Sequence, residues 1–212
     1  MTTARREDAA PGKAPQIGVI VLAAGASTRL GEPKQLLRIE GVPLIVRAVN
    51  AALDSPLWPV VVVVGSSAAA IKTELARHPV LIAENSAWIE GMASSLRTGI
   101  ATLQSFSRSL DGALVALCDQ PAFSPSTIER LLQKAPADLD GHIVASQYLG
   151  RLGAPALFSR TYFQALASLS GDEGARHVIA AARQAGKVIA VDMPELALDL
   201  DTPEDVARLG RR

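Results

Sequence analysis

The chain has 212 residues, 49% hydrophobic and 20% charged, which suits one domain with a sizeable core. Lysine plus arginine and aspartate plus glutamate number 21 each, so there is no net positive charge to attract nucleic acid or an anionic membrane. The aromatic share of 4% also argues against a stacking surface for single-stranded nucleic acid. We therefore expect neither nucleic acid nor a membrane as a partner.

The cysteine content and the N-terminus bear on the compartment. Cys118 is the only cysteine and cannot form a disulfide within the chain, as is usual in the reducing cytoplasm. Residues 1–15 lack the apolar segment of a signal peptide, and the apolar run Val60–Val64 is too short to span a bilayer. We expect a cytoplasmic protein with a disordered tail at residues 1–15 and a single domain at residues 16–212.

Short apolar runs rich in β-branched residues alternate with helical patterns along the chain. Runs such as Val60–Val64 are apolar on both faces, as expected for strands that helices cover on both sides. The alternation predicts a doubly wound α/β fold with a mostly parallel sheet. The predicted strands are Ile17–Ala23, Pro59–Val64, Val80–Ala83, Ala113–Leu117, His142–Ser146, Ala154–Phe158, Val188–Val191 and Leu198–Leu200. The predicted helices are Pro43–Leu53, Ala68–Arg77, Met92–Gln104, Pro125–Lys134, Arg160–Leu169, Gly174–Ala185 and Pro203–Leu209.

The alternation changes between residues 141 and 158, where two short strands follow each other without a helix between them. We expect this segment to form a small β-rich insertion or flap over the carboxyl edge of the sheet. No internal repeat or linker interrupts the predicted domain.

A loop of small residues follows the first predicted strand and ends in Glu-Pro-Lys at residues 32–34. Small residues let backbone N–H groups approach a polyphosphate, and Arg29 and Lys34 carry charges that would neutralise it. The carboxyl end of a strand is also where open α/β sheets bind ligands. The loop is not a P-loop, since five residues separate Gly25 from Gly31, and it lacks the glycine spacing of a dinucleotide fingerprint. A nucleoside triphosphate site is favoured over the alternative of two solvated surface cations.

Asp119 follows the predicted strand Ala113–Leu117 at the same edge of the sheet. A carboxylate there can hold a divalent cation that also bridges phosphate oxygens, as Mg²⁺ does. The alternative is an ordinary turn aspartate before Pro121. The neighbouring Cys118 is interpreted as a small core residue rather than a nucleophile, because no suitably placed histidine is evident.

Two further aspartates lie near the C-terminus. Alternation along the predicted strand Leu198–Leu200 would put Asp199 and Asp201 on one face, which suits shared metal coordination. Asp201 is the stronger metal candidate, because it lies at the end of the strand. The following Thr202 to Asp205 is fully explained as a helix start.

Two predicted helix starts offer further polar groups. Ser94 and Ser95 lie in the first turns of the helix that begins near Gly91, where N–H and hydroxyl donors would face a nucleoside. An ordinary helix N-terminus explains these serines equally well. Asp172 lies in an acidic turn between glycines and is interpreted from its local sequence as the cap of the next helix.

Taken together, these motifs resemble those of the molybdenum-cofactor cytidylyltransferase-like family, the MobA-like NTP transferases. The resemblance runs in order from about residue 17 to 209 and rests on residues 22–34, 91–97, 119–121, 153–155, 171–176 and 199–205. It implies the Rossmann-like fold of the nucleotide-diphospho-sugar transferases. The nucleoside triphosphate and Mg²⁺ would bind to the N-terminal half, and the acceptor would lie over the C-terminal half.

The resemblance also implies roles for individual residues. Arg29, Lys34 and Asp119 would be catalytic, Asp119 and Asp201 would bind Mg²⁺, and the substrate contacts would come from Ala23, Ala24, Gly25, Ser27, Ser94, Ser95, Gly153 and Asp172. The Ala-Ala-Gly form of the loop is similar to that of CTP-using relatives, whereas guanylyl-transferring relatives typically carry Gly-Gly. Ala154 departs from the family, which often has histidine between the glycine and proline of this element.

The implied reaction moves CMP from CTP to a phosphate-bearing acceptor of the molybdopterin type and releases pyrophosphate. A recipient molybdoenzyme or its chaperone is the implied protein partner. Two alternatives stay open. One is a related nucleotidyltransferase that uses GTP or another acceptor, such as a sugar phosphate or methylerythritol phosphate. The other is a non-catalytic nucleotide-binding factor for molybdoenzyme maturation.

Overall fold

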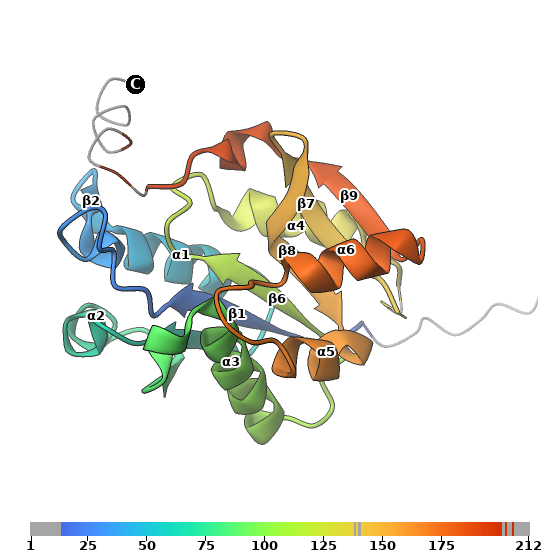
Figure 1. The fold of residues 1–212 in the computed structure, drawn as a ribbon, viewed down its shortest axis with the longest axis horizontal. Coiled ribbons are helices and arrows are strands. Elements are labelled where there is room, and N and C mark those ends of the chain that lie inside the picture. The colour runs from blue at the N-terminus through green and yellow to red at the C-terminus, as the bar shows by residue number, and fades with distance from the viewer. Residues whose placement is uncertain (1–13, 138, 140, 201, 203–204, 206–212) are drawn as a thin grey trace, which may run out of the picture.

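The computed structural model describes residues 14–137, 139, 141–200, 202 and 205. Seven strands form one sheet in the order β5-β4-β1-β6-β8-β7-β9, and only β8 among them runs antiparallel to its neighbours (Figure 1). The predicted α/β fold with a mostly parallel sheet is confirmed. The strands are β1 (Ile17–Ala23), β4 (Val60–Val64), β5 (Leu81–Glu84), β6 (Gly112–Leu117), β7 (Ile143–Tyr148), β8 (Arg151–Ser159) and β9 (Val188–Asp192).

Helices cover both faces of this sheet (Figure 1). Along β1, Val19 and Val21 belong to the apolar cluster on one face, whereas Ile20 and Leu22 belong to the cluster on the other, as the two-residue period of a strand requires. The first cluster includes residues of α1 (Leu44–Leu53), α2 (Ala68–Glu74) and α4 (Pro125–Lys134). The second includes residues of α3 (Met92–Phe106), α5 (Phe163–Ala167) and α6 (Arg176–Gln184). Within the described residues, no helix is long and apolar enough to cross a membrane.

The β-rich segment expected at residues 141–158 is present, but it is not a flap lying over the sheet. Its strands β7 and β8 form an antiparallel hairpin inside the sheet, because β8 pairs with β6 and β7 pairs with β9. Residues 156–158 of β8 pair with both β6 and β7, whereas residues 151–153 pair with β7 and not with β6, so the hairpin tip reaches past the region where β8 pairs with β6. A separate small sheet, β2 (Arg38–Ile39) with β3 (Val42–Pro43), was not predicted.

Other predicted elements differ from the structure. The predicted bounds of β1 and α4 are confirmed, but the predicted helix at residues 160–169 is a 3-10 turn, Arg160–Tyr162, followed by the short α5. The prediction of a strand at residues 198–200 is wrong. These residues follow the 3-10 helix Pro194–Ala197 without joining a strand, and the Leu200 N–H donates to the Asp119 carbonyl instead (3.1 Å). The predicted tail and the predicted helix at residues 203–209 lie almost wholly outside the described residues.

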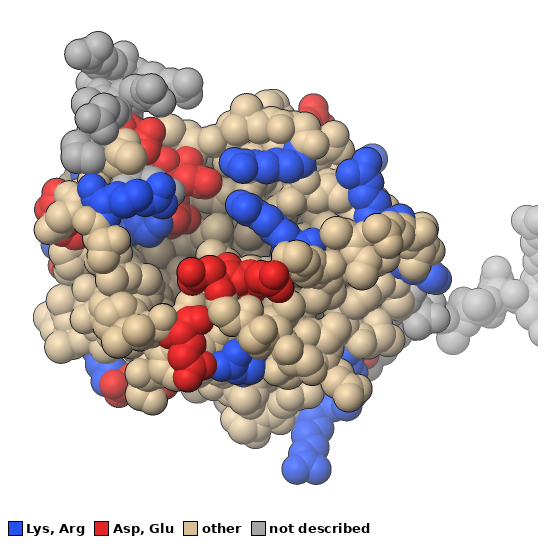
Figure 2. Space-filling model, viewed as in Figure 1, with Lys and Arg blue, Asp and Glu red and all other residues tan. Residues whose placement is uncertain are grey.

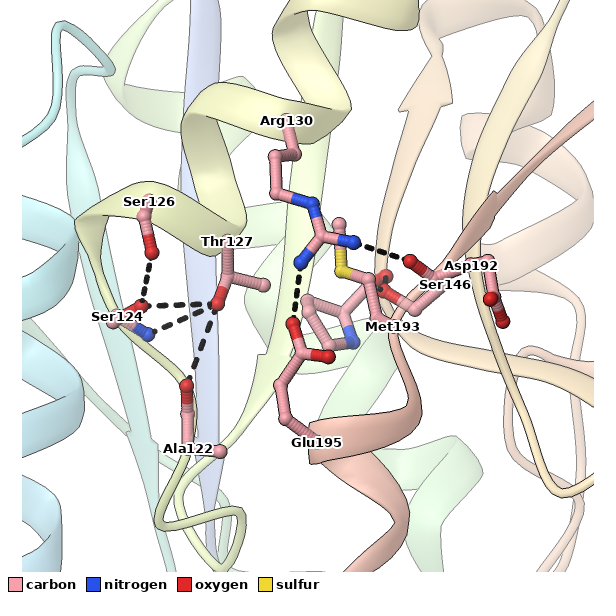
Figure 3. Close-up of polar contacts among 10 residues, drawn as sticks. Ala122, Ser124, Ser126, Thr127, Arg130, Ser146, Asp192, Met193 and Glu195 are labelled. Carbon is pink, nitrogen blue, oxygen red and sulfur yellow. Dashed lines mark hydrogen bonds and ion pairs between the residues drawn. The ribbon is translucent and has the colours of Figure 1, made fainter.

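Polar contacts of α4 fix the approach of this C-terminal segment (Figure 3). A capping box joins Ser124 and Thr127 at the start of the helix. Further along, the Arg130 guanidinium donates to the carboxylate of Glu195 and to the backbone oxygen of Asp192 (Figure 3). Helix α4 therefore binds the end of β9 and the residues that follow it. From there the chain runs on to the carboxyl edge of the sheet.

Candidate active site

The loop after β1 is held by a side chain that the sequence did not single out. Gln35 is buried, and its amide nitrogen donates to the backbone oxygens of Ala23 (3.0 Å) and Gly25 (2.7 Å). Ser66 donates a second hydrogen bond to the Gly25 oxygen (3.0 Å). These bonds hold the turn of small residues in one conformation. The only signal in the sequence was the position of Gln35 directly after Lys34.

Ser27, a predicted substrate contact, and Arg29, a predicted triphosphate ligand, do not line the cleft that opens at the carboxyl ends of β1 and β6. The hydroxyl oxygen of Ser27 accepts a hydrogen bond from the Lys34 N–H (3.1 Å), which closes the loop on itself. Arg29 lies in an exposed turn, and neither residue is among those that line the cleft. The structure therefore gives Ser27 a role in the loop, and triphosphate binding by Arg29 stays a prediction.

Lys34 and Asp119 meet across the sheet edge. The Lys34 ammonium forms an ion pair with Asp119 Oδ2, and only 18% and 14% of the two side chains is exposed. They come together because β1 and β6 are parallel neighbours, so the loops after them lie side by side. The second carboxylate oxygen, Asp119 Oδ1, is buried and has no hydrogen-bond partner among the described residues. An anionic oxygen in this state suits a cation, because a buried charge needs compensation.

The second predicted metal ligand, Asp201, lies outside the described residues. The chain just before it does reach Asp119, through the hydrogen bond from the Leu200 N–H to the Asp119 carbonyl. Asp199 is half-buried beside this bond. In the described part of the chain, no three His, Cys, Asp or Glu side chains are grouped so as to hold a metal. Of the two predicted ligands, only Asp119 is therefore placed.

Cys118 is buried beside the ion pair. Burial, and then the charge of Asp119, raise the pKa of its thiol to about 12, although the charge of Lys34 acts in the opposite direction. The group therefore stays a neutral thiol at physiological pH. Its burial confirms the interpretation as a small core residue.

A cleft of about 600 Å³ opens at the carboxyl ends of β1 and β6. Figure 2 shows a hollow on this side of the molecule, with acidic and basic side chains on its rim. The cleft-lining residues include the predicted Ala23, Ala24, Gly25, Lys34, Ser95, Asp119 and Asp172, together with Gln35, Trp88 and Met92.

The serines at the start of α3 have different surroundings. The Asn85 amide nitrogen donates to the hydroxyl oxygens of both Ser94 (2.8 Å) and Ser95 (3.0 Å). Ser94 donates in turn to the Gly91 carbonyl (2.8 Å), and its side chain does not line the cleft. Ser95 lines the cleft, so of the two predicted serines only Ser95 faces it. The sequence signal for Asn85 was its position two residues after the predicted strand Val80–Ala83.

A second pocket, of about 130 Å³, adjoins the cleft. The predicted acceptor residues Gly153 and Asp172 both line it, as do Tyr148 and Arg176, to which the sequence assigned no role. Four residues line the cleft as well as the pocket and so mark the boundary between the two: Leu22, Met92, Leu117 and Asp172. The structure thus places a space over the C-terminal half of the sheet directly beside the proposed nucleotide cleft.

At this boundary, the turn at residues 171–172 packs closely against Gly91. A Cβ atom at Gly91 would lie 2.3 Å from Asp172 Oδ1 and 2.6 Å from the Gly171 carbonyl oxygen, closer than side chains approach. The Ala93 N–H also donates to the Gly171 carbonyl (3.2 Å). Arg97 on α3 adds hydrogen bonds to the Leu169 carbonyl (2.7 Å) and to Glu90 (2.9 Å). The turn that carries Asp172 is therefore held against the start of α3.

Comparisons with known proteins agree with this architecture. Nicotine blue oxidoreductase of Paenarthrobacter nicotinovorans is 33% identical over 204 residues, which are 92% of this chain and 97% of that protein. The purine catabolism protein PucB of Bacillus subtilis is 30% identical over 210 residues, which are 94% of this chain and 98% of that protein.

Among solved structures, Rv0371c of Mycobacterium tuberculosis has a TM-score of 0.76 and 30% identity, over 94% of this chain and 100% of that one. A second structure of Rv0371c is a complex with manganese and has a TM-score of 0.71. The family model described as the MobA-like NTP transferase domain matches residues 19–188. The protein is therefore a member of the MobA-like NTP transferase family, a family of nucleotidyltransferases.

Proposed function

We propose that the protein transfers CMP from CTP to a phosphate-bearing acceptor of the molybdopterin type and releases pyrophosphate. The observation that carries this proposal is the placement of Lys34 and Asp119 in a cleft that shares a wall with the second pocket. A nucleotide in the cleft and an acceptor in the pocket would meet at Asp172 and Met92. The names of the two curated relatives differ, so the acceptor has to be inferred from this chain's own pocket.

The reaction is an in-line displacement at phosphorus. An oxygen of the acceptor phosphate forms a bond to the α-phosphorus of CTP, and the bond from that phosphorus to the bridging oxygen of the β-phosphate breaks. An ionised phosphate needs no general base, so the protein contributes position and charge. The ammonium of Lys34 would stabilise negative charge on the triphosphate, and the loop at Ala23–Gly25 would let backbone groups approach it.

The residues present fit a divalent cation. The unsatisfied Asp119 Oδ1 is a hard oxygen ligand of the kind that Mg²⁺ prefers, and Asp201 is proposed as the second ligand from the sequence. When bound, Mg²⁺ would neutralise charge on the triphosphate. The manganese complex of the relative Rv0371c supports a divalent cation in proteins of this architecture.

A pyrimidine base is favoured by the wall of the cleft. Ala23 and Ala24 both line the cleft, and each adds a methyl group that a Gly-Gly pair would lack. Ala24 packs closely against Gly65: a Cβ atom added at Gly65 would lie only 2.9 Å from the Ala24 Cβ. Ala24 therefore has little freedom to move. Ala23 belongs to the apolar cluster of α1, α2 and α4, and Ala24 to that of α3, the helix from which Ser95 lines the cleft, so the Ala24 methyl group is the one proposed to crowd a purine more than a pyrimidine.

Pyrophosphate release tests the proposal. The protein is incubated with Mg²⁺, one of CTP, UTP, GTP and ATP, and one of three acceptors: molybdopterin, a hexose 1-phosphate or methylerythritol phosphate. We expect release with CTP and molybdopterin, and much less with the purine triphosphates. Release with GTP at the rate seen with CTP would contradict the assignment of the base. CTP binding without pyrophosphate release from any acceptor would instead support a non-catalytic maturation factor.

A further inference from the structure

Two grooves lie at the edge of the sheet opposite the cleft. Their walls include the residues that precede β1, β4 and β6, at positions 15–16, 58–59 and 107–110. The cleft opens at the carboxyl ends of β1 and β6, so these amino ends lie a strand's length away from it. For the seven residues of β1 that length is roughly 20 Å. The grooves therefore form a surface separate from the candidate active site.

The first groove, of about 300 Å³, is apolar and aromatic. Trp58 and Phe106 line it, and 50% of each residue is exposed. Their rings meet edge to face, with the centroids 6.4 Å apart. Pro15 and Pro56 also line this aromatic groove. Two half-exposed aromatic rings at one place leave apolar area that a partner would bury.

The second groove, of about 390 Å³, is cationic. Arg108 and Arg160 line it, both are exposed, and neither guanidinium forms a hydrogen bond or an ion pair with another described residue. No Asp or Glu is among the described residues that line either groove. Ser107 and Leu110 line both, so the aromatic and the cationic groove are continuous. Two unpaired guanidinium groups make a local positive patch that suits carboxylates.

Hydrogen bonds between separate segments hold this surface in one arrangement. The Asp111 N–H donates to the Gln16 carbonyl (2.7 Å), and the Asp111 carboxylate accepts from the Gln16 N–H (2.7 Å). The Asp111 carbonyl accepts from the Arg160 N–H (2.8 Å), and the Trp58 N–H donates to the Ile17 carbonyl (2.9 Å). The backbone that carries Trp58 and Arg160 is thus fixed before any partner arrives, which lowers the entropy lost on binding.

The composition of this surface indicates the class of partner. Tryptophan and arginine are the residue types that most often contribute binding energy in protein–protein interfaces. A nucleic acid would need phosphate contacts along an extended basic face, whereas this chain has no net charge and the positive patch consists of Arg108 and Arg160. An acidic peptide with an apolar side chain would fit both grooves at once.

We propose that this surface docks an acidic segment of a partner protein. An apolar side chain of that segment would lie in the aromatic groove, and its carboxylates would pair with Arg108 and Arg160. The inference does not rest on the proposed function, because the two grooves share no lining residue with the cleft or with the second pocket. A partner docked here would leave the cleft open.

Peptide selection tests the inference. A phage library of random short peptides is selected on the full chain. We expect the enriched peptides to combine Asp or Glu with Leu, Phe, Trp or Pro. Enrichment of basic or uncharged peptides, or no enrichment at all, would overturn the inference.

Charge reversal locates the bound peptide. A synthetic copy of an enriched peptide is titrated into the protein by calorimetry. Arg108→Glu and Arg160→Glu should each weaken its binding at least about tenfold, the value of one charge-assisted contact. Arg151→Glu is the control, because Arg151 is an exposed arginine at the start of β8, outside both grooves, and its variant should bind the peptide unchanged. Equal affinities of all three variants for the peptide would overturn the inference.

Trp58 tests the aromatic groove. Trp58→Ser should weaken peptide binding about tenfold, with folding checked by thermal unfolding. A second measurement needs no change at Trp58. The chain has two tryptophans, so in a Trp88→Phe protein the emission comes from Trp58 alone. A bound peptide without tryptophan should shift this emission, and an unchanged spectrum at saturating peptide would overturn the inference even if the Trp58 variant failed to fold.

Competition separates this proposal from the others. A single-stranded oligonucleotide that displaces the peptide and binds more tightly would identify the surface as a nucleic-acid site and overturn the inference. Displacement of the peptide by CTP would place the peptide in the cleft, which would also overturn it and leave the transferase proposal standing. Peptide binding that depends on Arg108 and Arg160 would support the docking surface even if no acceptor gave pyrophosphate release.

Discussion

Asn85 and Ser95 form a buried hydrogen bond of 3.0 Å, in which the Asn85 amide nitrogen donates to the Ser95 hydroxyl oxygen. Because the amide is the donor, the hydroxyl hydrogen of Ser95 must point elsewhere. Ser95 lines the cleft, so its hydrogen would be available to an acceptor atom of the proposed nucleotide. Asn85 itself is held in place, since its oxygen accepts from the Ala87 N–H (3.0 Å).

Ser95→Ala should therefore raise the KM for CTP about tenfold, the value of one hydrogen bond, with a smaller effect on kcat. Steady-state pyrophosphate release measures both constants. Ser105→Ala is the matched control, because Ser105 is an exposed serine on the same helix whose hydroxyl donates to the Thr102 carbonyl (2.8 Å). A KM for the Ser95 variant equal to that of the control would remove Ser95 from the nucleotide site.

Asp119→Ala should keep the fold and lose nearly all transferase activity. The variant lacks the carboxylate that pairs with Lys34 and that is proposed to bind Mg²⁺. The loss of one preorganised charge contact costs about 3 kcal/mol, or roughly a hundredfold in rate. Circular dichroism checks the fold and pyrophosphate release the rate, with Asp54→Ala, at the exposed end of α1, as the control. Turnover like that of the unmodified protein would show that Asp119 is not part of the catalytic site.

Gly91→Ala should destabilise the protein by about 1–3 kcal/mol. The backbone of Gly91 has a φ of 103°, which side chains disfavour, and the added Cβ would meet the turn at Gly171 and Asp172. Urea unfolding measures the change in free energy. Gly25→Ala is the comparison, since nothing lies within 4 Å of a Cβ there and the φ of Gly25 is not positive. Equal stabilities of the two variants would mean that the turn moves aside without cost.

Cys118 should resist thiol reagents in the folded protein at pH 8. With a pKa of about 12, roughly one thiol in ten thousand is ionised at that pH, and the side chain is also buried. In urea the pKa falls toward its ordinary value and the thiol should react at once. Reaction with Ellman's reagent, followed by absorbance with and without urea, measures the difference. Rapid modification of the native protein would show that the site opens readily.

Much of the site follows from local sequence. The continuous apolar run of β1 and the Ser-Pro start of α4 are signals that a segment carries by itself, so the predicted bounds of both elements hold. The pairing of Lys34 with Asp119 was also within reach of the sequence. Residues after two buried strands of a parallel sheet lie at one edge, and the structure brings these two together.

Other features depend on partners that are distant in the chain. Leu198–Leu200 alternates like a strand, yet none of the described strands pairs with it, and the Leu200 N–H donates to the Asp119 carbonyl instead. The hairpin of β7 and β8 was expected as an appendage because no helix separates its strands, but the free edge of β6 takes β8 into the sheet. Where a strand joins the sheet depends on which neighbouring strand has a free edge. The sequence of the segment itself does not contain that information.

The sequence by itself thus determined the α/β class, the phosphate-type loop and the carboxyl-edge position of Asp119, because strand periodicity, small residues and strand ends are local properties. Only the tertiary structure decided that Gln35 holds the loop, that Ser95 rather than Ser94 faces the cleft, and that Asp172 stands between cleft and pocket. Each of these depends on hydrogen bonds or close packing between separate segments. Such contacts exist only once the chain has brought those segments together.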